Sequence, residues 1–468
     1  MPKQQIPLIK GDKIDANTDY RDALPMNMLV IPKPILDAAG YMLCHPGLTQ
    51  FGTAPGADRG GVYNDQQGTH FRVSGQKLVS IDTAGVMTVL GTISGSSQAA
   101  MPYSTSTQAV IVDGKYYLYD TTAGFRQVTD IDLGTPLDAE WIDGYYFFTD
   151  GLNIFHTDLT DEAQIDPLKY STADFMPDPV LGIGKTQDDK VMVFGRYSIE
   201  YFLNAGTTDF AFTRISNRAQ KIGIVATHAK VEVQGQFFIT GSRKQESLGV
   251  HVVGVGSSTK ISTREIDKIL AQYTDADLID MRMESRSEED IELVYIHLPN
   301  ECLCFNITAS QGFGKEMAWS IVTTGKLEKS WRAINGVYDP RNHKWVYGDK
   351  TEWFSCYLDH TVFTQYGVAS EWLLYTPFMN METMSIDEIE MQTIPGNTVF
   401  DDATLAFSMT KDGQNWSMEW WSMYGEPLDY NHRYIVRRLG TVNEWVGLRF
   451  RSVTKSRMAF SGLSVTYG

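Results

Sequence analysis

Three adjacent residues, Gly184, Lys185 and Thr186, resemble the end of a phosphate-binding loop. In that motif, backbone amides and a lysine hold the phosphates of a nucleotide. The full motif needs a glycine five positions before Gly184, but Pro179 stands there. It also needs a helix directly afterwards, whereas Val191 to Phe194 has the apolar run of a strand. The motif is therefore incomplete, and we do not expect nucleotide binding.

Cys302 and Cys304 are two positions apart, so their side chains share one face if the segment is a strand. A zinc site would need two further ligands at short spacing, and the neighbouring sequence contains no such pair. The only other cysteines, Cys44 and Cys356, leave too few thiols for a disulfide framework in 468 residues. We expect buried core thiols and no metal site.

The segment TKDGQNW, Thr410 to Trp416, resembles the Asp-box turn of sialidase-like propellers. In the Asp-box pattern one residue separates the aspartate from the glycine, but here Gly413 directly follows Asp412. The segment also occurs only once. A β-hairpin turn is the better interpretation.

A catalytic acid and base must face a common cleft. The acidic run Glu288, Glu289 and Asp290 follows a polar stretch and is typical of a solvated loop. The histidines have neither ligand nor triad spacing, and the chain has no Gly-x-Ser-x-Gly nucleophile motif. We predict no catalytic residue, no cofactor-binding residue and no cofactor, and we expect a protein that is not an enzyme.

Basic residues gather near the end of the chain, although the formal net charge is −17. They could meet an acidic neighbouring subunit or DNA phosphates, or they could lie on a solvated strand face with counter-charges of their own. The sequence leaves both interpretations open. The cluster comprises Arg433, Arg437, Arg438, Arg449, Arg451, Lys455 and Arg457.

The elements that position these residues are predicted to be mainly β-strands. Three segments contain a two-residue turn between two runs of residues that favour β-strands: Ala109 to Asp120, Glu140 to Gly151, and Val231 to Ser242. An Asp-Gly pair in this context predicts a hairpin, because glycine accepts the positive φ of the turn. Uneven repetition of such hairpins favours a β-propeller with decorated loops over residues 41–375, and a pair of β-sandwiches is the alternative. Further strands are expected in Lys190 to Phe202, Ile291 to Ile307 and Lys344 to Leu358.

One segment, Ser262 to Thr274, interrupts the β pattern. Ser262 and Glu265 have the spacing of a capping box, and apolar residues then recur on one helical face. We predict one inserted amphipathic helix that packs on the sheets.

The two ends of the chain are predicted to form separate units. Prolines at Pro2, Pro7, Pro25, Pro32 and Pro34 interrupt regular structure in residues 1–40, which we interpret as an extended N-terminal arm lying on another surface. Residues 376–468 contain several alternating segments and are predicted to form a C-terminal β-sandwich-like module.

Composition excludes several classes of protein. An acidic chain is a poor candidate for tight DNA binding, which depends on basic patches. No apolar stretch approaches the roughly 20 residues of a membrane-spanning helix. Met1 to Lys13 lacks the apolar core of a signal peptide, so we expect folding in a reducing cytoplasm.

Short segments along nearly the whole chain resemble, in the same order, the packaged-DNA stabilisation proteins of short-tailed phages of the Salmonella and Shigella podovirus type. Residues from about 110 to 190 are the least similar. The matching segments are Met1–Gly11, Leu24–Leu29, Thr105–Val110, Ser198–Phe202, Glu265–Thr274, Tyr295–Pro299, Tyr347–Lys350, Thr410–Trp416 and Val453–Gly462.

This resemblance implies a structural tail hub, or nozzle, protein of the virion tail. It implies a hexameric ring below the portal-adaptor ring that closes the DNA exit channel and stabilises packaged DNA. It also implies contacts with the tail needle and with tailspikes, while viral DNA passes without sequence-specific binding. The family supplies no catalytic residue and no short interface motif, so partner-interface residues remain unknown. The competing hypothesis is a propeller that binds or hydrolyses glycans, and a glycan array would distinguish the two.

Overall fold

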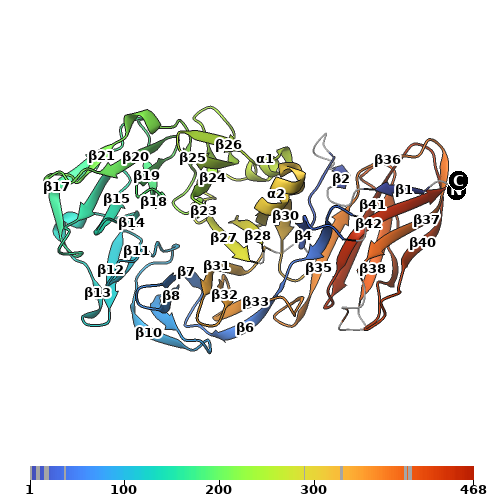
Figure 1. The fold of residues 1–468 in the computed structure, drawn as a ribbon, viewed down its shortest axis with the longest axis horizontal. Helices are drawn as coiled ribbons and strands as arrows, with labels where there is room; N and C mark the ends of the chain where they lie inside the picture. The colour runs from blue at the N-terminus through green and yellow to red at the C-terminus, as the bar shows by residue number, and fades with distance from the viewer. Residues whose placement is uncertain are drawn as a thin grey trace.

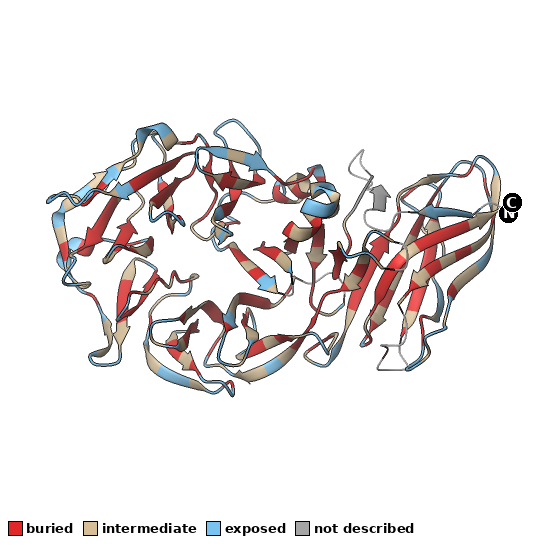
Figure 2. Ribbon diagram, in the orientation of Figure 1, coloured by how far each residue is buried: buried red, intermediate tan, exposed pale blue. Residues whose placement is uncertain are grey.

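The computed structural model describes residues 3–6, 11–14, 21–35, 38–288, 290–326, 330–394, 398 and 403–468. Two β-rich bodies lie side by side, a ring of blades and a smaller sandwich (Figure 1). In both bodies the buried residues concentrate on the strands, as Figure 2 shows. The chain is thus mainly β, as predicted.

Seven antiparallel blades form the ring in the described part of the chain. The first four are β7 (Asp58–Asn64), β8 (Thr69–Ser74), β9 (Lys77–Ile81) and β10 (Met87–Thr92); β11 (Gln108–Val112), β12 (Lys115–Asp120) and β13 (Gly124–Gln127); β14 (Asp138–Ile142), β15 (Tyr145–Thr149), β16 (Asn153–Thr157) and β17 (Ile165–Thr172); and β18 (Val180–Lys185), β19 (Val191–Gly195), β20 (Ile199–Asn204) and β21 (Phe212–Arg214). The last three are β22 (Gly223–Ile224), β23 (Lys230–Val233), β24 (Gln236–Ser242), β25 (Gly249–Gly254) and β26 (Ser257–Lys260); β27 (Arg282–Glu288), β28 (Ile291–His297), β29 (Cys302–Asn306) and β30 (Trp319–Val322); and β31 (Ala333–Asp339), β32 (Lys344–Asp349), β33 (Phe354–Asp359) and β6 (Gly47–Thr53).

The predicted hairpins are present. Both central residues of all three turns have positive φ: Asp113 and Gly114 at 47° and 72°, Asp143 and Gly144 at 52° and 92°, and Gln234 and Gly235 at 52° and 75°. This backbone conformation matches the twist of the flanking strands, which is why Asp-Gly marks hairpins so well.

Strand β6 closes the ring. It precedes the first blade in sequence but pairs with β33 of the last blade, for example Tyr357 with Thr49 and Leu358 with Leu48. Such a closure ties the two ends of the ring together through backbone hydrogen bonds, and it could not be read from local sequence patterns.

Two facing sheets form the sandwich. One contains β4 (Met28–Ile31), β5 (Tyr41–Cys44), β42 (Ala459–Tyr467), β37 (Met384–Thr393) and β40 (Tyr434–Val442), and the other contains β35 (Val368–Tyr375), β41 (Trp445–Thr454), β38 (Thr404–Thr410) and β39 (Trp420–Met423). Short strands β34 (Thr364–Gln365) and β36 (Met379–Asn380) add to the second sheet. Because β34 pairs with both β6 and β35, this sheet continues into the last blade. The hydrogen-bonded connection makes the ring and the sandwich one continuous structure.

The N-terminal arm lies on the sandwich of the same chain. Strand β1 (Lys3–Ile6) pairs with β42, and Lys3 forms a 3.0 Å ion pair with Glu390. Strands β2 (Gly11–Ile14) and β3 (Arg21–Ala23) form a hairpin. Pro2 and Pro7 lie outside the described residues. The limits 1–40, 41–375 and 376–468 stay predictions.

The predicted amphipathic helix is present but shorter than expected, as α1 (Arg264–Leu270). Its predicted capping box does not form, because Thr263 occupies the N-cap position and Ser262 donates its hydroxyl to Asp267 instead. A second helix, α2 (Ile307–Phe313), was not predicted; the side chain of Asn306 accepts a hydrogen bond from the Ala309 amide at its start. Within the described residues, three single-turn 3₁₀ segments are also present: η1 (Ile131–Leu133), η2 (Ser216–Arg218) and η3 (Lys315–Met317).

Candidate functional site

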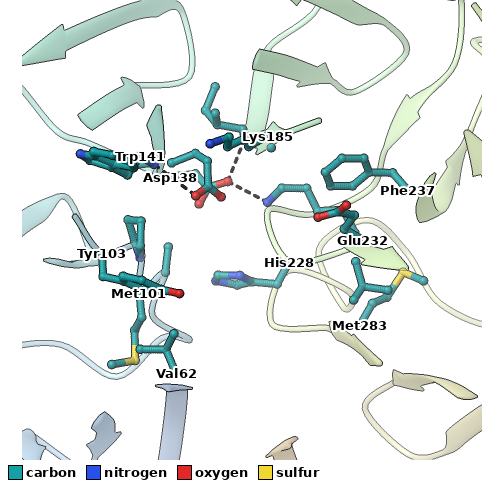
Figure 3. Close-up of a pocket in the computed structure, with 18 of the residues that line it drawn as sticks. Val62, Met101, Tyr103, Asp138, Trp141, Lys185, His228, Glu232, Phe237 and Met283 are labelled. Atoms are coloured by element: carbon teal, nitrogen blue, oxygen red, sulfur yellow. Dashed lines mark hydrogen bonds and ion pairs between the residues drawn. The ribbon is translucent and has the colours of Figure 1, made fainter. Parts of the chain in front are cut away.

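A cavity of about 740 Å³ lies where the inner strands β14, β18 and β23 converge (Figure 3). Its lining comes from the third, fourth and fifth blades, with contributions from the first and sixth blades and from residues 100–103. The central position follows from the fold, because the inner strands of all blades surround one axis.

Two of the residues that line this cavity form an ion pair. Asp138 on β14 accepts a 2.7 Å hydrogen bond from Lys230 on β23, and it also accepts one of 2.8 Å from the Ile183 amide on β18. A single carboxylate therefore connects three consecutive blades. Beside it, a ring nitrogen of His228 lies 3.3 Å from the carbonyl oxygen of Gln98, which precedes the second blade.

Farther along the same strands, Glu140, Lys185 and Glu232 line the wall. Burial raises the pKa of Glu140 to about 7, against the effect of a hydrogen bond from the Trp141 amide. Desolvation also raises the pKa of Glu232. Lys185 is 3.0 Å from Asp189 and lies 5.9 Å from the centre of the Trp141 ring. Neither Glu140 nor Glu232 forms an ion pair with another described residue.

A second polar network joins the first blade to the last. Arg72 donates to Asp58 at 2.7 Å and to the carbonyl oxygen of Asn335 at 2.9 Å. Asn335 in turn donates to Asp58 at 2.7 Å. Desolvation raises the pKa of Asp58 despite its partners. This network stabilises the seam that β6 closes.

Several histidines are buried in the neutral form. Burial lowers the pKa of His45 to about 3, that of His70 to about 4 and that of His297 to about 4. His297 donates to the carboxylate of Glu284 at 2.9 Å and stacks on Trp331. These groups belong to the packed interior.

The sequence-derived candidates lie as follows. Gly184 and Lys185 are on β18 and reach the cavity, but strand β19 follows them, so the geometry of a phosphate loop is absent from this described segment. Cys302 and Cys304 are buried in one core cluster, and burial raises the pKa of Cys304 to about 12. Among the described residues, no three histidine, cysteine or acidic side chains come together to hold a metal ion.

The Asp-box-like segment is a turn between β38 and β39. The Thr410 hydroxyl donates to Asp412 at 3.0 Å, and Asp412 accepts from the Asn415 amide at 2.8 Å. The hairpin interpretation is confirmed. In the acidic run, Glu288 ends β27 and pairs with His360 at 3.0 Å, while Glu289 lies outside the described residues.

Four of the late basic residues have carboxylate partners on the same module. Arg433 pairs with Glu390, Arg437 with Glu388, Arg449 with Glu419, and Arg451 with both Glu371 and Glu419. For these four arginines, the interpretation of a strand face with its own counter-charges is confirmed.

An apolar edge is exposed on the sandwich. Strand β39 ends its sheet and, among the described strands, pairs only with β38. Met418 is 83% exposed, and Trp420 and Trp421 are 43% and 48% exposed. An unpaired strand edge with large exposed apolar side chains is a surface for a partner.

The sequence interpretation did not identify Asp138, Glu140, Lys230 or Glu232 as site residues. One sequence feature could have identified them: each residue lies in the first strand of a predicted hairpin, and the inner strand of a blade comes first. Their convergence depends on the ring closure, which no local pattern shows. No helix among the residues described is long and apolar enough to span a membrane.

Comparison with known proteins covers nearly the whole chain. Residues 4–363 match the family model described as the β-propeller of bacteriophage P22 Gp10, and residues 371–468 match that of its β-sandwich. The tail hub protein gp10 of Salmonella phage P22 is 32% identical, over 99% of both chains. Among solved structures, a streptogramin B lyase has a TM-score of 0.44 at 9% identity, over 67% of this chain and 97% of its own. A virginiamycin B lyase from Staphylococcus aureus has the same TM-score and identity, over 67% of this chain and 99% of its own.

Proposed function

Because this chain belongs to the bacteriophage P22 Gp10 family, we propose that it is the tail hub of a short-tailed phage and closes the DNA exit channel of the virion. The observation that carries the proposal is the 32% identity to a tail hub protein across 99% of both chains. Both family models match in order, so the relationship includes the propeller and the sandwich.

The hub stabilises packaged DNA as a rigid part. Its stiffness is supported by the closed ring of blades and by the sheet that continues from the last blade through β34 into the sandwich. A ring and a sandwich that share one hydrogen-bonded sheet resist deformation under load better than two domains joined by a flexible linker.

In this proposal the DNA passes through the centre of a hexameric ring of copies, not along the axis of one propeller. Inner strands of the third and fifth blades come close enough for Asp138 and Lys230 to form a 2.7 Å ion pair, which supports this proposal. The formal charge of −17 also fits a lumen from which DNA slides without sticking.

Neighbouring copies would meet through the exposed edge of β39. A ring of identical subunits repeats one heterologous contact until it closes, and Met418, Trp420 and Trp421 offer apolar anchors for such a contact. The remaining surfaces would bind the portal-adaptor ring above, the tail needle below and the tailspikes nearby. Assembly takes place in the host cytoplasm.

A sealing assay tests the function. Purified chain is mixed with DNA-filled capsids that carry portal and adaptor but no hub, and the nuclease-sensitive DNA is measured over time. We expect the wild-type chain to protect the packaged DNA and the Trp421→Glu variant to leave it exposed. Continued leakage with folded wild-type chain on the capsids would contradict the proposal.

A further inference from the structure

The central cavity of the propeller has the size of a ligand site. Its volume of about 740 Å³ lies within the range of roughly 300–1,000 Å³ that is typical for small-molecule pockets. Figure 3 shows Trp141 and Tyr103 on one side of the cavity and Phe237 on the other, with charged side chains between them. Apolar rings with a few polar groups between them are the usual composition of a binding site.

Most charges on the lining are already balanced. Lys230 pairs with Asp138 at 2.7 Å, and Lys185 pairs with Asp189 at 3.0 Å. Glu140 and Glu232 remain as carboxylates, and Arg282 as a buried guanidinium, without an ion-pair partner among the described residues. Desolvation raises the pKa of both carboxyl groups and outweighs the ammonium of Lys185, which lowers it.

This arrangement discriminates between ligand classes. An anion would face Glu140 and Glu232, and an organic cation between them would face the ammonium of Lys185, which acts on the pKa of both carboxylates. A hydroxylated neutral ligand avoids both repulsions, because each hydroxyl can donate to a carboxylate or accept from an ammonium. The C–H face of a sugar ring also packs against aromatic rings without a charge requirement.

We propose that the central cavity binds a neutral saccharide, with Glu140 and Glu232 accepting hydrogen bonds from its hydroxyls, Lys185 donating to it, and Trp141 and Phe237 packing against its apolar face. The cavity lies in the ring and the exposed edge of β39 lies in the sandwich, so the saccharide site does not rest on the proposed function. It gives the propeller a second role, the recognition of a carbohydrate.

A binding experiment on the full-length chain tests the proposal. An array of short neutral oligosaccharides from Gram-negative lipopolysaccharides selects the probe, and the best fragment is then titrated by calorimetry. We expect saturable binding with a dissociation constant in the micromolar to millimolar range. Glu232→Gln and Trp141→Ala should each weaken it by about tenfold or more. If Trp141→Ala does not fold, Trp141→Phe and Glu140→Gln replace it.

Matched controls lie outside the cavity. Trp353→Ala removes a tryptophan that is 66% exposed on the last blade, and Glu246→Gln removes a surface carboxylate that pairs with Arg243. Both should bind the fragment as the wild type does. The proposal is overturned if no array member binds at millimolar concentration, if the cavity variants bind normally, or if putrescine saturates the cavity and no saccharide does.

Discussion

Arg72 on β8 and Asp58 on β7 form a 2.7 Å ion pair that is closed to solvent at the seam between the first and last blades. The guanidinium also donates to the carbonyl oxygens of Ile334, Asn335 and Val346 in the last blade. One fully buried side chain thus satisfies acceptors on both sides of the seam.

Removal of this arginine should strongly destabilise the ring. Arg72→Met removes the guanidinium from three carbonyl groups and from the Asp58 carboxylate, which keeps only neutral donors such as Asn335. Breaking a buried pair in this way typically costs about 3–5 kcal/mol. The double variant Arg72→Met/Asp58→Leu should recover part of that loss, because no unpaired charge is left behind. Urea denaturation at pH 8 measures the free energy of unfolding of each variant.

The control is an exposed ion pair of similar length. Arg243→Ala breaks the 3.1 Å pair with Glu246, whose side chains are 53% and 48% exposed, and should change stability by less than about 1 kcal/mol. Equal effects of Arg72→Met and Arg243→Ala would contradict the structural role given to the seam.

Acid should destabilise the protein through its buried histidines. The pKa of His45 is about 3 and that of His297 about 4 in the folded chain, against an ordinary value of 6.5, because both are buried. As pH falls below 6.5, the unfolded chain binds protons that the folded chain does not bind. The stability from these groups is therefore full above pH 6.5 and falls down to about pH 4 for His297 and about pH 3 for His45. Each histidine contributes roughly 3 kcal/mol to this loss.

Thermal unfolding between pH 8 and pH 4 measures this effect. His45→Gln should reduce the pH dependence of the thermal midpoint. A flat profile for the wild-type chain would contradict the burial of neutral imidazoles.

Glu140 should act in the opposite direction. Its pKa of about 7 lies above the ordinary 4.5, so the folded chain binds a proton there that the unfolded chain releases. Stability from this group is therefore present below pH 4.5 and lost as pH rises through 7. Glu140→Gln should stabilise the chain at pH 8 by about 1–3 kcal/mol and have little effect at pH 4.5. Thermal melts at the two pH values compare the variant with the wild type, and destabilisation at pH 8 would contradict the assignment.

The sequence predicted local structure well and long-range structure poorly. Asp143-Gly144 identified a hairpin because turn conformation is decided by the two residues themselves. The pairing of β6 with β33 joins Leu48 to Leu358, and no local preference encodes such a distant partner. The sequence likewise placed an amphipathic helix near Ser262 but not its start, because Ser262 bonds to Asp267 and to the Val250 amide of the fifth blade.

The candidate site was missed for the same reason. Asp138 and Lys230 are 92 positions apart and meet only after the third and fifth blades have closed around one axis. Glu140 and Glu232, which no sequence pattern singled out, are likewise brought to one cavity by the fold.

Asn27 should anchor the N-terminal arm. Its side-chain amide donates to the Thr323 hydroxyl at 2.7 Å and to the carbonyl oxygen of Glu371, and its side-chain oxygen accepts from the Thr323 amide at 2.8 Å. Asn27 also has a φ of 53°, which asparagine tolerates better than alanine. Asn27→Ala should cost about 2–4 kcal/mol, since buried polar partners are left unsatisfied. Urea denaturation measures the loss, with Asn217→Ala in η2, at an exposed asparagine, as the control, which should stay within about 0.5 kcal/mol.

The exposed edge of β39 should decide incorporation into the tail. Trp421 is 48% exposed, so Trp421→Glu should leave the thermal midpoint of the isolated chain within a few degrees of wild type. In the contact between two neighbouring copies of the ring, the carboxylate introduced by Trp421→Glu would be buried without a partner. Such burial costs several kcal/mol at each repeated interface. Complementation of a phage that lacks its hub, followed by quantification of the chain in purified particles, should show at least about a tenfold loss of incorporation.

Trp353→Glu, at a tryptophan that is 66% exposed on the last blade, is the matched control and should be incorporated normally. Normal incorporation of Trp421→Glu would exclude this edge as the subunit contact, whereas loss with both variants would show that any added acidic charge on the surface disrupts assembly.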